Sequence, residues 1–226
     1  MRAEAVDRYG DSMFHANICL TRWLLVIGCA ACGKEEAKPA VGGTAASPGT
    51  MTPVAEPPPA AEAAPSKLDV LLAKTTLGEA VELLKPDMTD TDDETSAGAL
   101  LLGIWAAKHL TWKDVGLTKN ETSAARVRKD SDANRGKRMC VRGRIIQIHK
   151  EKAGEVTLFT GLMLSGYTEI TSFIAAGSTG ELVQRSGARF CGVVTGTYDY
   201  SNSGGGKGHA ISIVGMFDLP ENRTAK

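Results

Sequence analysis

RMCVRGRIIQIH, residues 138–149, marks the point where the sequence changes from a helical to a strand-like pattern. Four stretches of the same kind follow: EVTLFTGLML (155–164), YTEITSFIAA (167–176), ARFCGVVTGTYDY (188–200) and HAISIVGMFDL (209–219). Each is short, rich in Val, Ile, Thr and aromatic residues, and bounded by turn residues, as β-strands are. Residues 177–187 start with capping hydroxyl groups and carry Leu182 and Val183, so we predict one helix there. The expected order is β-β-β-α-β-β.

That order is the order of the OB-fold, a five-stranded Greek-key barrel. GKRMCVRGRIIQI (136–148) and GARFCGVVTGTY (187–198) resemble the first and fourth strands of tRNA-anticodon-like OB-fold domains in bacterial envelope proteins. Gly143 and Gly192 would lie where barrel strands bend. The resemblance covers residues 137–219 and implies the fold rather than a particular function, with an SH3-like barrel as the alternative. We therefore predict a β protein with a small α segment, in which a short helical region and a disordered tether precede an OB-like barrel.

Short helices are predicted over residues 67–122. Thr76 and Glu79 fit a capping box, and apolar residues follow them at helical spacing. A second helix is expected over about 96–109, and Thr111 begins a short third one.

An acidic stretch, DMTDTDDE (87–94), separates the first two of these helices. It invites comparison with a calcium-binding EF-hand loop. Counted from Asp90, however, Thr95 stands where the sharp turn needs Gly, and Leu101 stands where a bidentate Glu is needed. We therefore predict a solvated acidic loop.

Charge is balanced over the whole chain, with 26 Lys and Arg against 26 Asp and Glu, so net charge gives no case for a nucleic-acid or membrane partner. Its distribution is uneven. Residues 67–122 carry 6 basic and 10 acidic side chains, and residues 123–152 carry 10 basic and 3 acidic ones. We interpret residues 123–136 as a basic connector and residues 220–226 as a tail.

The segment before the helices is rich in Pro and Ala. Residues 34–66 hold seven of the nine prolines of the chain and no Leu, Ile, Phe, Tyr or Trp. Such a stretch cannot bury enough apolar surface to offset the entropy of ordering it. We predict that residues 29–66 are a disordered tether.

An apolar run, Trp23–Cys32, lies near the N-terminus and is about half as long as a membrane-spanning helix requires. A charged start, a short apolar region and small residues are typical of a signal peptide. We predict one over residues 1–28, with Met13 as the better start.

VIGC, residues 26–29, resembles a bacterial lipobox. The resemblance implies cleavage after Gly28 and lipid attachment to Cys29. Lipid chains attached there would anchor the protein to a membrane. Ala30 then favours the outer over the inner membrane, with the folded part facing the periplasm. A plain secretory signal and a cytoplasmic apolar segment remain the alternatives.

Two further cysteines lie in the predicted strands, Cys140 in the first and Cys191 in the fourth. Those strands are neighbours in the OB-fold that the resemblance implies, and an oxidising envelope permits a disulfide. A bridge closing a loop of about 50 residues would contribute about 3–4 kcal/mol. Because strand register cannot be read from the sequence, two buried thiols remain the alternative.

No pattern of catalytic residues stands out. Residues 177–180 are one residue short of a nucleophile elbow, and residues 203–208 lack the flanking residues of a phosphate-binding loop. The predicted folded part has no H-x-x-x-H or C-x-x-C of zinc spacing. We therefore predict a protein that is not an enzyme and holds no metal or cofactor.

OB-folds bind ligands with the second and third strands and two neighbouring loops, here expected at about 150–154 and 201–208. The candidate binding residues are basic, aromatic or polar: Arg142, Arg144, Lys150, Lys152, Tyr198, Tyr200, Asn202, Lys207 and His209. Side chains of this kind bind nucleic acid through phosphate contacts and stacking, and they bind anionic glycans, lipid headgroups or acidic protein faces equally well. A solvated strand edge is the alternative interpretation.

Two functions follow from these patterns. The first is a lipid-anchored envelope protein whose barrel binds a protein, a glycan or another envelope component. The second is a nucleic-acid-binding protein that uses the basic face of the first strand. Export makes the second less favoured, because nucleic acid is scarce at an envelope surface.

Overall fold

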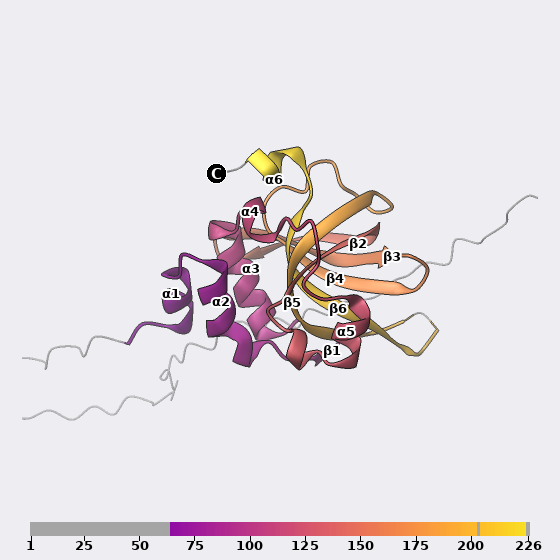
Figure 1. Cartoon of the computed structure of the whole chain (residues 1–226), viewed down its shortest axis with the longest axis horizontal. Coiled ribbons are helices and arrows are strands. Elements are labelled where there is room, and N and C mark those ends of the chain that lie inside the picture. Colours follow the sequence, from indigo (N-terminus) through magenta and orange to yellow (C-terminus); the bar gives the residue numbers. More distant parts are fainter. Residues whose placement is uncertain (1–63, 203, 225–226) are drawn as a thin grey trace, which may run out of the picture. The chain divides into compact units, whose positions relative to one another are not determined.

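The computed structural model describes residues 64–202 and 204–224 (Figure 1). The predicted signal peptide, the predicted lipid attachment at Cys29 and all but the last three residues of the predicted tether lie outside the described residues. In the part of the chain that is described, no helix is both long and apolar enough to cross a membrane.

Five strands form a ring of hydrogen-bonded neighbours. They are β2 (Arg138–Ala153), β3 (Val156–Ser165), β4 (Glu169–Ala175), β5 (Gly187–Ser201) and β6 (Lys207–Phe217). The sheet order is β1-β5-β2-β3-β4-β6, and β6 also pairs with β5, which closes the ring. Only β4 and β6 run parallel among the ring pairs. The prediction of a mainly β fold with a small α segment is confirmed, and all five predicted strands are present.

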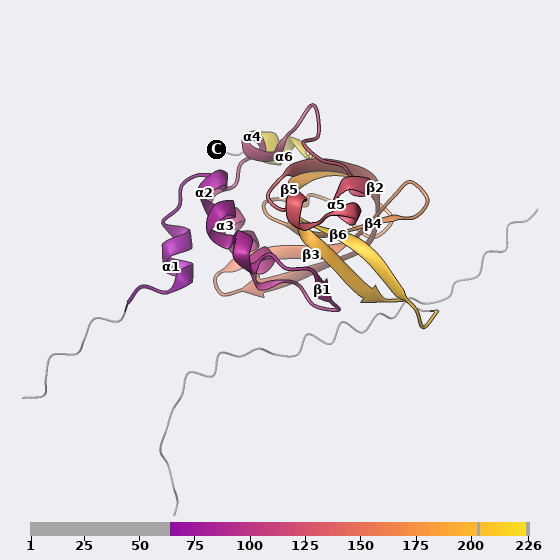
Figure 2. The same cartoon turned by 60° about the horizontal axis from the view of Figure 1, so that its bottom comes forward.

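A sixth strand was not expected. β1 (Thr91–Asp92) comes from the acidic stretch and pairs in parallel with β5 at Tyr198 and Asp199. Figure 2 shows it beside the β5–β6 hairpin, which extends beyond the rest of the ring. The sequence could not reveal this pairing because β1 contributes only two residues to it.

Aromatic packing fills the inside of the ring. Phe173, Phe190 and Phe217 are buried, and their ring centroids lie 5.0–5.5 Å apart. Gly143 and Gly192 allow neighbouring strands to approach closely: a Cβ on either would lie 2.2 Å from a carbonyl oxygen of the adjacent strand. Glycine is therefore required at both positions, because the backbone of the adjacent strand leaves no room for a side chain.

The predicted helix over residues 177–187 is wrong. The connection from β4 to β5 is a series of turns, in which Gly177, Gly180 and Arg185 have φ values of 78°, 51° and 74°. A helix needs φ near −60°, so these residues cannot belong to one. Leu182 nevertheless packs against the ring core, as an inward-facing helical residue would. The observed order of the ring elements is therefore β-β-β-β-β without an intervening helix.

Four helices lie on one side of the ring (Figure 1): α1 (Lys67–Leu72), α2 (Leu77–Leu84), α3 (Ala97–His109) and α4 (Trp112–Val115). α3 and α4 contact the ring strands, and α1 and α2 pack on α3. A short 3-10 helix, η1 (Lys85–Asp87), follows α2. The predicted capping box is confirmed, because Thr76 Oγ1 accepts from the Glu79 amide and the Glu79 carboxylate accepts from the Thr76 amide. In α3, Gly103 lies against Ile174 of β4, where a Cβ would be 2.8 Å from its Cγ2.

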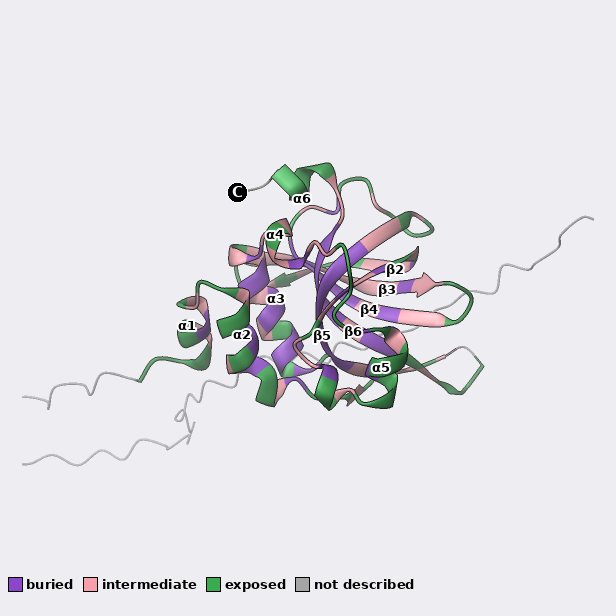
Figure 3. Cartoon of the chain, in the orientation of Figure 1, coloured by how far each residue is buried: buried purple, intermediate pink, exposed green. Residues whose placement is uncertain are grey.

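The helical layer and the ring share buried surface. One core cluster contains Leu71 and Trp105 from the helices together with Leu158 and Val214 from the strands. Figure 3 shows the buried residues of α2 and α3 facing the ring and the exposed residues facing outward. A second cluster fills the ring interior.

Two predicted irregular segments are ordered elements of the fold. The basic connector forms α5 (Ala124–Lys129) and a 3-10 helix, η2 (Asp132–Asn134), and Val127 of α5 is fully buried in the ring cluster. The predicted tail forms α6 (Pro220–Thr224). Asn222 of α6 is 2% exposed and bonds the backbone of Ser178 and Phe217. Both segments thus belong to the folded unit.

Candidate binding surface

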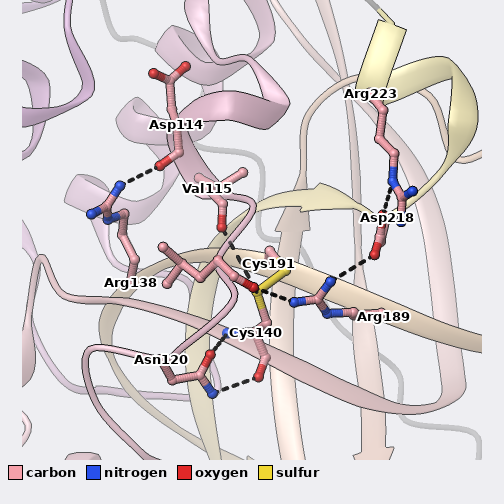
Figure 4. Close-up of a disulfide and its surroundings, with 10 residues drawn as sticks. Asp114, Val115, Asn120, Arg138, Cys140, Arg189, Cys191, Asp218 and Arg223 are labelled. Atoms are coloured by element: carbon pink, nitrogen blue, oxygen red, sulfur yellow. Dashed lines mark hydrogen bonds and ion pairs between the residues drawn. A yellow bond between two sulfur atoms is a disulfide. The ribbon is translucent and has the colours of Figure 1, made fainter.

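A disulfide joins the first and fourth strands of the ring. Cys140 lies directly opposite Cys191 in the register of β2 and β5, and their sulfur atoms are bonded (Figure 4). The backbone N–H and C=O of Cys140 both bond the side-chain amide of Asn120 rather than β5. Cys140 and Cys191 therefore form a non-hydrogen-bonded pair, the kind in which cross-strand side chains approach most closely.

The loop after α4 covers the free edge of β2 beside this disulfide. Asn120 bonds Cys140 as a neighbouring strand would, and Glu121 bonds the backbone and the guanidinium of Arg138. These hydrogen bonds from Arg138 lower the pKa of Glu121, although burial opposes the shift. The Arg138 guanidinium also donates to the carbonyl of Asp114 (Figure 4). This edge of β2 is therefore occupied by side chains instead of a strand.

Next to the disulfide, three charged residues form a compact cluster. Arg189 donates to Asp218 at 2.9 Å and to the carbonyl of Leu117 at 2.6 Å, and Arg223 donates to the other oxygen of Asp218 at 2.6 Å (Figure 4). The Asp218 side chain is only 7% exposed. The hydrogen bond from Arg223 is the largest influence that lowers the pKa of Asp218, Arg189 adds to it, and burial opposes it.

A shallow hollow of about 300 Å³ opens beside this cluster. One part of its wall is charged, with Arg142 from β2, Arg189 from β5 and Asp218 after β6. The other part is apolar and includes Leu182, Ala188, Phe217 and Leu219. Of the nine candidate binding residues, Arg142 alone lines this hollow.

The four basic candidates on β2 have no charged partner in the described part of the protein. Arg142, Arg144, Lys150 and Lys152 are all exposed, and within residues 64–202 and 204–224 none of them forms an ion pair. The expected loop at 150–154 is shorter than predicted, because β2 continues to Ala153. Lys150 and Lys152 are therefore strand residues, which pair opposite Phe159 and Thr157 of β3.

The five other candidates lie together on the β5–β6 hairpin. The rings of Tyr198 and Tyr200 stack with their centroids 6.3 Å apart. Tyr200 also lies over Gly208, where a Cβ would be 2.3 Å from the ring. Burial raises the pKa of both tyrosines, and at Tyr198 the charge of Asp93 adds to this effect. The sequence placed these aromatic side chains correctly on the strands that flank the loop.

The polar members of the hairpin are occupied by partners within the protein. Asn202 Oδ1 accepts from the amides of Gly204 and Gly206 and so closes the turn. The Lys207 ammonium lies 2.7 Å from Asp92, and His209 Nδ1 lies 2.6 Å from Asp199. Hydrogen bonding to Asp92 raises the pKa of Lys207.

The acidic stretch over residues 87–94 is exposed at Asp90, Asp92 and Asp93, as predicted, but its carboxylates also contact the β5–β6 hairpin. Asp90 accepts a hydrogen bond from the amide of Thr197 at 2.7 Å and pairs with Arg135 at 2.9 Å. Asp93 accepts from the amide of Ser201 at 2.9 Å. These carboxylates bind the backbone of the hairpin. Thr197 and Ser201, which donate the hydrogen bonds, lie more than 100 residues further along the chain.

The nine candidates thus form two groups rather than one surface. Four unpaired cations lie along β2, and five partnered side chains lie on the β5–β6 hairpin. The sequence missed Arg189, Asp218 and Asn120, because nothing local distinguishes them from other polar residues next to strands.

Comparisons with protein families and with curated proteins give no relative to set beside this geometry. No protein-family model matches the chain, and a search of curated proteins gives no significant match. In the described part of the chain, no group of three His, Cys, Asp or Glu side chains is arranged to hold a metal ion.

Proposed function

We propose that this protein is a non-enzymatic, lipid-anchored protein of the bacterial cell envelope, whose OB-fold barrel binds a protein, a glycan or another envelope component. The order of the ring carries the proposal of a binding barrel. The first ring strand, β2, lies beside the fourth, β5, and the third, β4, runs parallel to the fifth, β6, as in OB barrels. Proteins with this barrel commonly bind extended ligands on its surface.

The envelope location rests on the sequence. Val26–Cys29 resembles a lipobox, an apolar run precedes it, and a Pro-rich segment follows it. The bonded Cys140 and Cys191 are consistent with an oxidising compartment, where disulfides persist. Lipid attachment at Cys29 would then hold the barrel at the periplasmic face of a membrane, with the outer membrane favoured.

The ligand surface that we propose is the set of basic side chains on β2. The bulge between Ile145 and Gln147 places Lys150 and Lys152 on the opposite face of the sheet from Arg142 and Arg144. The four unpaired cations of this set are available to an anionic ligand, whereas Lys207 and His209 already contact carboxylates. An acidic protein face or an anionic glycan fits this charge. The same observation favours nucleic acid as the second candidate, because phosphates bind such cations.

The first experiment tests the anchor. The full chain and its Cys29→Ala variant would be expressed in a Gram-negative host, fractionated and analysed by intact mass. We expect the wild-type chain in the membrane fraction, beginning at Cys29 and carrying acyl mass that the variant lacks. Soluble, uncleaved protein in both cases would remove the envelope proposal.

The second experiment separates the two ligand classes. The full chain would be titrated with a single-stranded oligonucleotide and with an anionic polysaccharide at about 50 and 200 mM salt. Nucleic-acid binding that collapses over this range, and that needs all four β2 cations, would favour the second candidate. Binding to the polysaccharide that persists at the higher salt would favour the first. A variant with glutamine at the four β2 positions is the control for charge.

A further inference from the structure

Arg142 stands in an unusual electrostatic position. It lies directly opposite Arg189 in the antiparallel register of β2 and β5, one step along the same face from the Cys140–Cys191 pair. Like charges directly opposite each other destabilise a sheet unless a counter-charge lies between them. For Arg189 that counter-charge is Asp218. Among the residues that the structure describes, Arg142 has no such partner.

Both oxygens of the single carboxylate in the cluster already accept a hydrogen bond from an arginine. Asp218 accepts from Arg189 through one oxygen and from Arg223 through the other. In residues 64–202 and 204–224, no hydrogen bond or ion pair involves the Arg142 guanidinium, and its side chain is exposed. The cluster therefore has three guanidinium groups for one carboxylate, and the unpaired charge belongs to Arg142.

The hollow beside Arg142 has one charged wall and one apolar wall. Arg142 and Arg189 form its basic wall, and Leu182, Phe217 and Leu219 contribute apolar surface to the rest. A cavity of about 300 Å³ is at the small end of ligand pockets, so it suits a small molecule or the end of a chain. A guanidinium binds a carboxylate with two parallel hydrogen bonds.

We propose that the hollow beside Arg142 binds a small monocarboxylate with a short apolar body, in which the carboxylate pairs with Arg142 and the apolar body contacts Leu182 and Leu219. One negative charge matches the one unpaired guanidinium. A doubly charged phosphate would carry one charge more than Arg142 can neutralise, and this extra charge would be repelled by Asp218 and desolvated at the apolar wall. The proposal rests on the binding function proposed above and names the class of ligand for one end of the β2 surface.

The ligand class has two natural sources, the C-terminus of a peptide and the end of a fatty acyl chain. N-acetyl-L-leucine represents the first source and octanoate the second. N-acetyl-L-leucinamide has the shape of the first probe without its charge, acetate has the charge without the apolar body, and inorganic phosphate has a different anion. Binding of each to the full chain is measured by calorimetric titration.

The matched control is on the same strand. Arg144 is exposed, unpaired and on the same face as Arg142, but it does not line the hollow. We expect N-acetyl-L-leucine or octanoate to bind. The amide, acetate and phosphate should bind at least about tenfold more weakly. Arg142→Gln should weaken binding of the carboxylate about tenfold, Arg142→Lys should weaken it less, and Arg144→Gln should leave it unchanged.

Equal binding of the acid and its amide would overturn the proposal, as would equal losses in Arg142→Gln and Arg144→Gln. Tight phosphate binding would overturn the choice of a monocarboxylate. If no carboxylate binds while the polysaccharide or oligonucleotide still needs the β2 cations, this inference is wrong and the proposed binding function stands. If neither kind of ligand binds, both are wrong.

Discussion

Asp218 shows how one side chain organises its surroundings. It follows directly after β6, is nearly buried, and accepts hydrogen bonds from two arginines that come from β5 and α6. Its pKa is lowered mainly by the bond from Arg223 and also by Arg189. The charged form of Asp218 is thus favoured in the folded state relative to the unfolded chain.

This shift predicts a dependence of stability on pH. A carboxyl group with a lowered folded-state pKa stabilises the fold above its unfolded pKa of about 3.9, and the contribution is lost as pH falls through the folded value. We expect Asp218→Asn to lower the free energy of unfolding by roughly 1–3 kcal/mol at pH 7, and by less at about pH 3. Urea unfolding at both pH values measures this.

The control for that experiment is Glu221→Gln, which alters an exposed carboxylate on the neighbouring helix α6. It should change the unfolding free energy by less than about 0.5 kcal/mol at either pH. A loss in Asp218→Asn that is the same at pH 7 and at about pH 3 would contradict the assigned role of its charge.

The disulfide between Cys140 and Cys191 should raise the free energy of unfolding. Cys140 and Cys191 are 51 positions apart, so their bond restricts a long loop of the unfolded chain. We expect the double variant Cys140→Ser/Cys191→Ser to lose about 3–4 kcal/mol of unfolding free energy in denaturant titrations.

Reduction of the wild-type chain should produce a similar loss, and the double variant should not respond to reductant. Because Cys19, Cys29 and Cys32 are also present, this comparison distinguishes the Cys140–Cys191 bond from effects of the N-terminal thiols. Equal stability of the oxidised wild type and the double variant would show that the bond does not restrain the folded ring.

At the scale of elements, the contact between α3 and the ring depends on one glycine. Gly103 lies inside α3, where Ala would favour the helix by about 1 kcal/mol. A Cβ there would lie 2.8 Å from Ile174 Cγ2 and 3.3 Å from Leu158 Cδ1. The helix must then move away from β3 and β4, or the two side chains must change rotamer.

We expect Gly103→Ala to destabilise the protein by about 1–3 kcal/mol through overpacking. Gly78→Ala in α2 is the matched substitution, since no heavy atom lies within 4 Å of its added Cβ. It should be neutral or stabilising by up to about 1 kcal/mol. Thermal unfolding followed by circular dichroism ranks the two variants, and a stabilising Gly103→Ala would refute the tight contact.

Local sequence patterns identified most elements and some of their ends. Thr76 with Glu79 predicted the start of α2, and the runs rich in Val, Ile, Thr and aromatic residues predicted all five ring strands. The same reasoning failed for residues 177–187, because capping hydroxyls and two apolar residues fit a turn series as well as a helix. Positive φ at Gly177, Gly180 and Arg185 follows from the path that the chain must take between β4 and β5.

At the scale of the whole molecule, the helices and the ring form one core. Leu71, Leu102 and Trp105 of the helical layer share a cluster with Leu158, Ile174 and Val214 of the ring. The Trp105 ring nitrogen also donates to the carbonyl of Lys74 at 2.8 Å, which ties α3 to the loop before α2. Neither layer can lose its partner without exposing buried apolar surface.

We therefore expect a single cooperative unfolding transition for the described part of the full chain, residues 64–202 and 204–224. Tryptophan fluorescence reports on the helical layer through Trp105 and Trp112, while the infrared amide I band of β-sheet reports on the strands. A Trp23→Phe background removes the tryptophan outside the described residues. Coincident midpoints would confirm one folding unit, and separated midpoints would show that the helical layer unfolds independently.

Local sequence patterns were sufficient to identify the strands, most helices and the ring positions of the cysteines and glycines, and to predict a mainly β chain. These properties depend on side-chain alternation and on caps within a few residues, so they are readable without knowledge of the rest of the chain. Lipid attachment at Cys29 stays a prediction of the same local kind.

The availability of each charged side chain, in contrast, depends on contacts that form when distant segments fold together. Asp92 neutralises Lys207, and Asp90 meets Thr197, across more than 100 residues of sequence in each case. Arg142, by contrast, meets another arginine and an apolar hollow. The physical reason is that the partner of a charge depends on which distant segments the ring brings together, and the energy of that contact leaves no periodic trace in the residues around it.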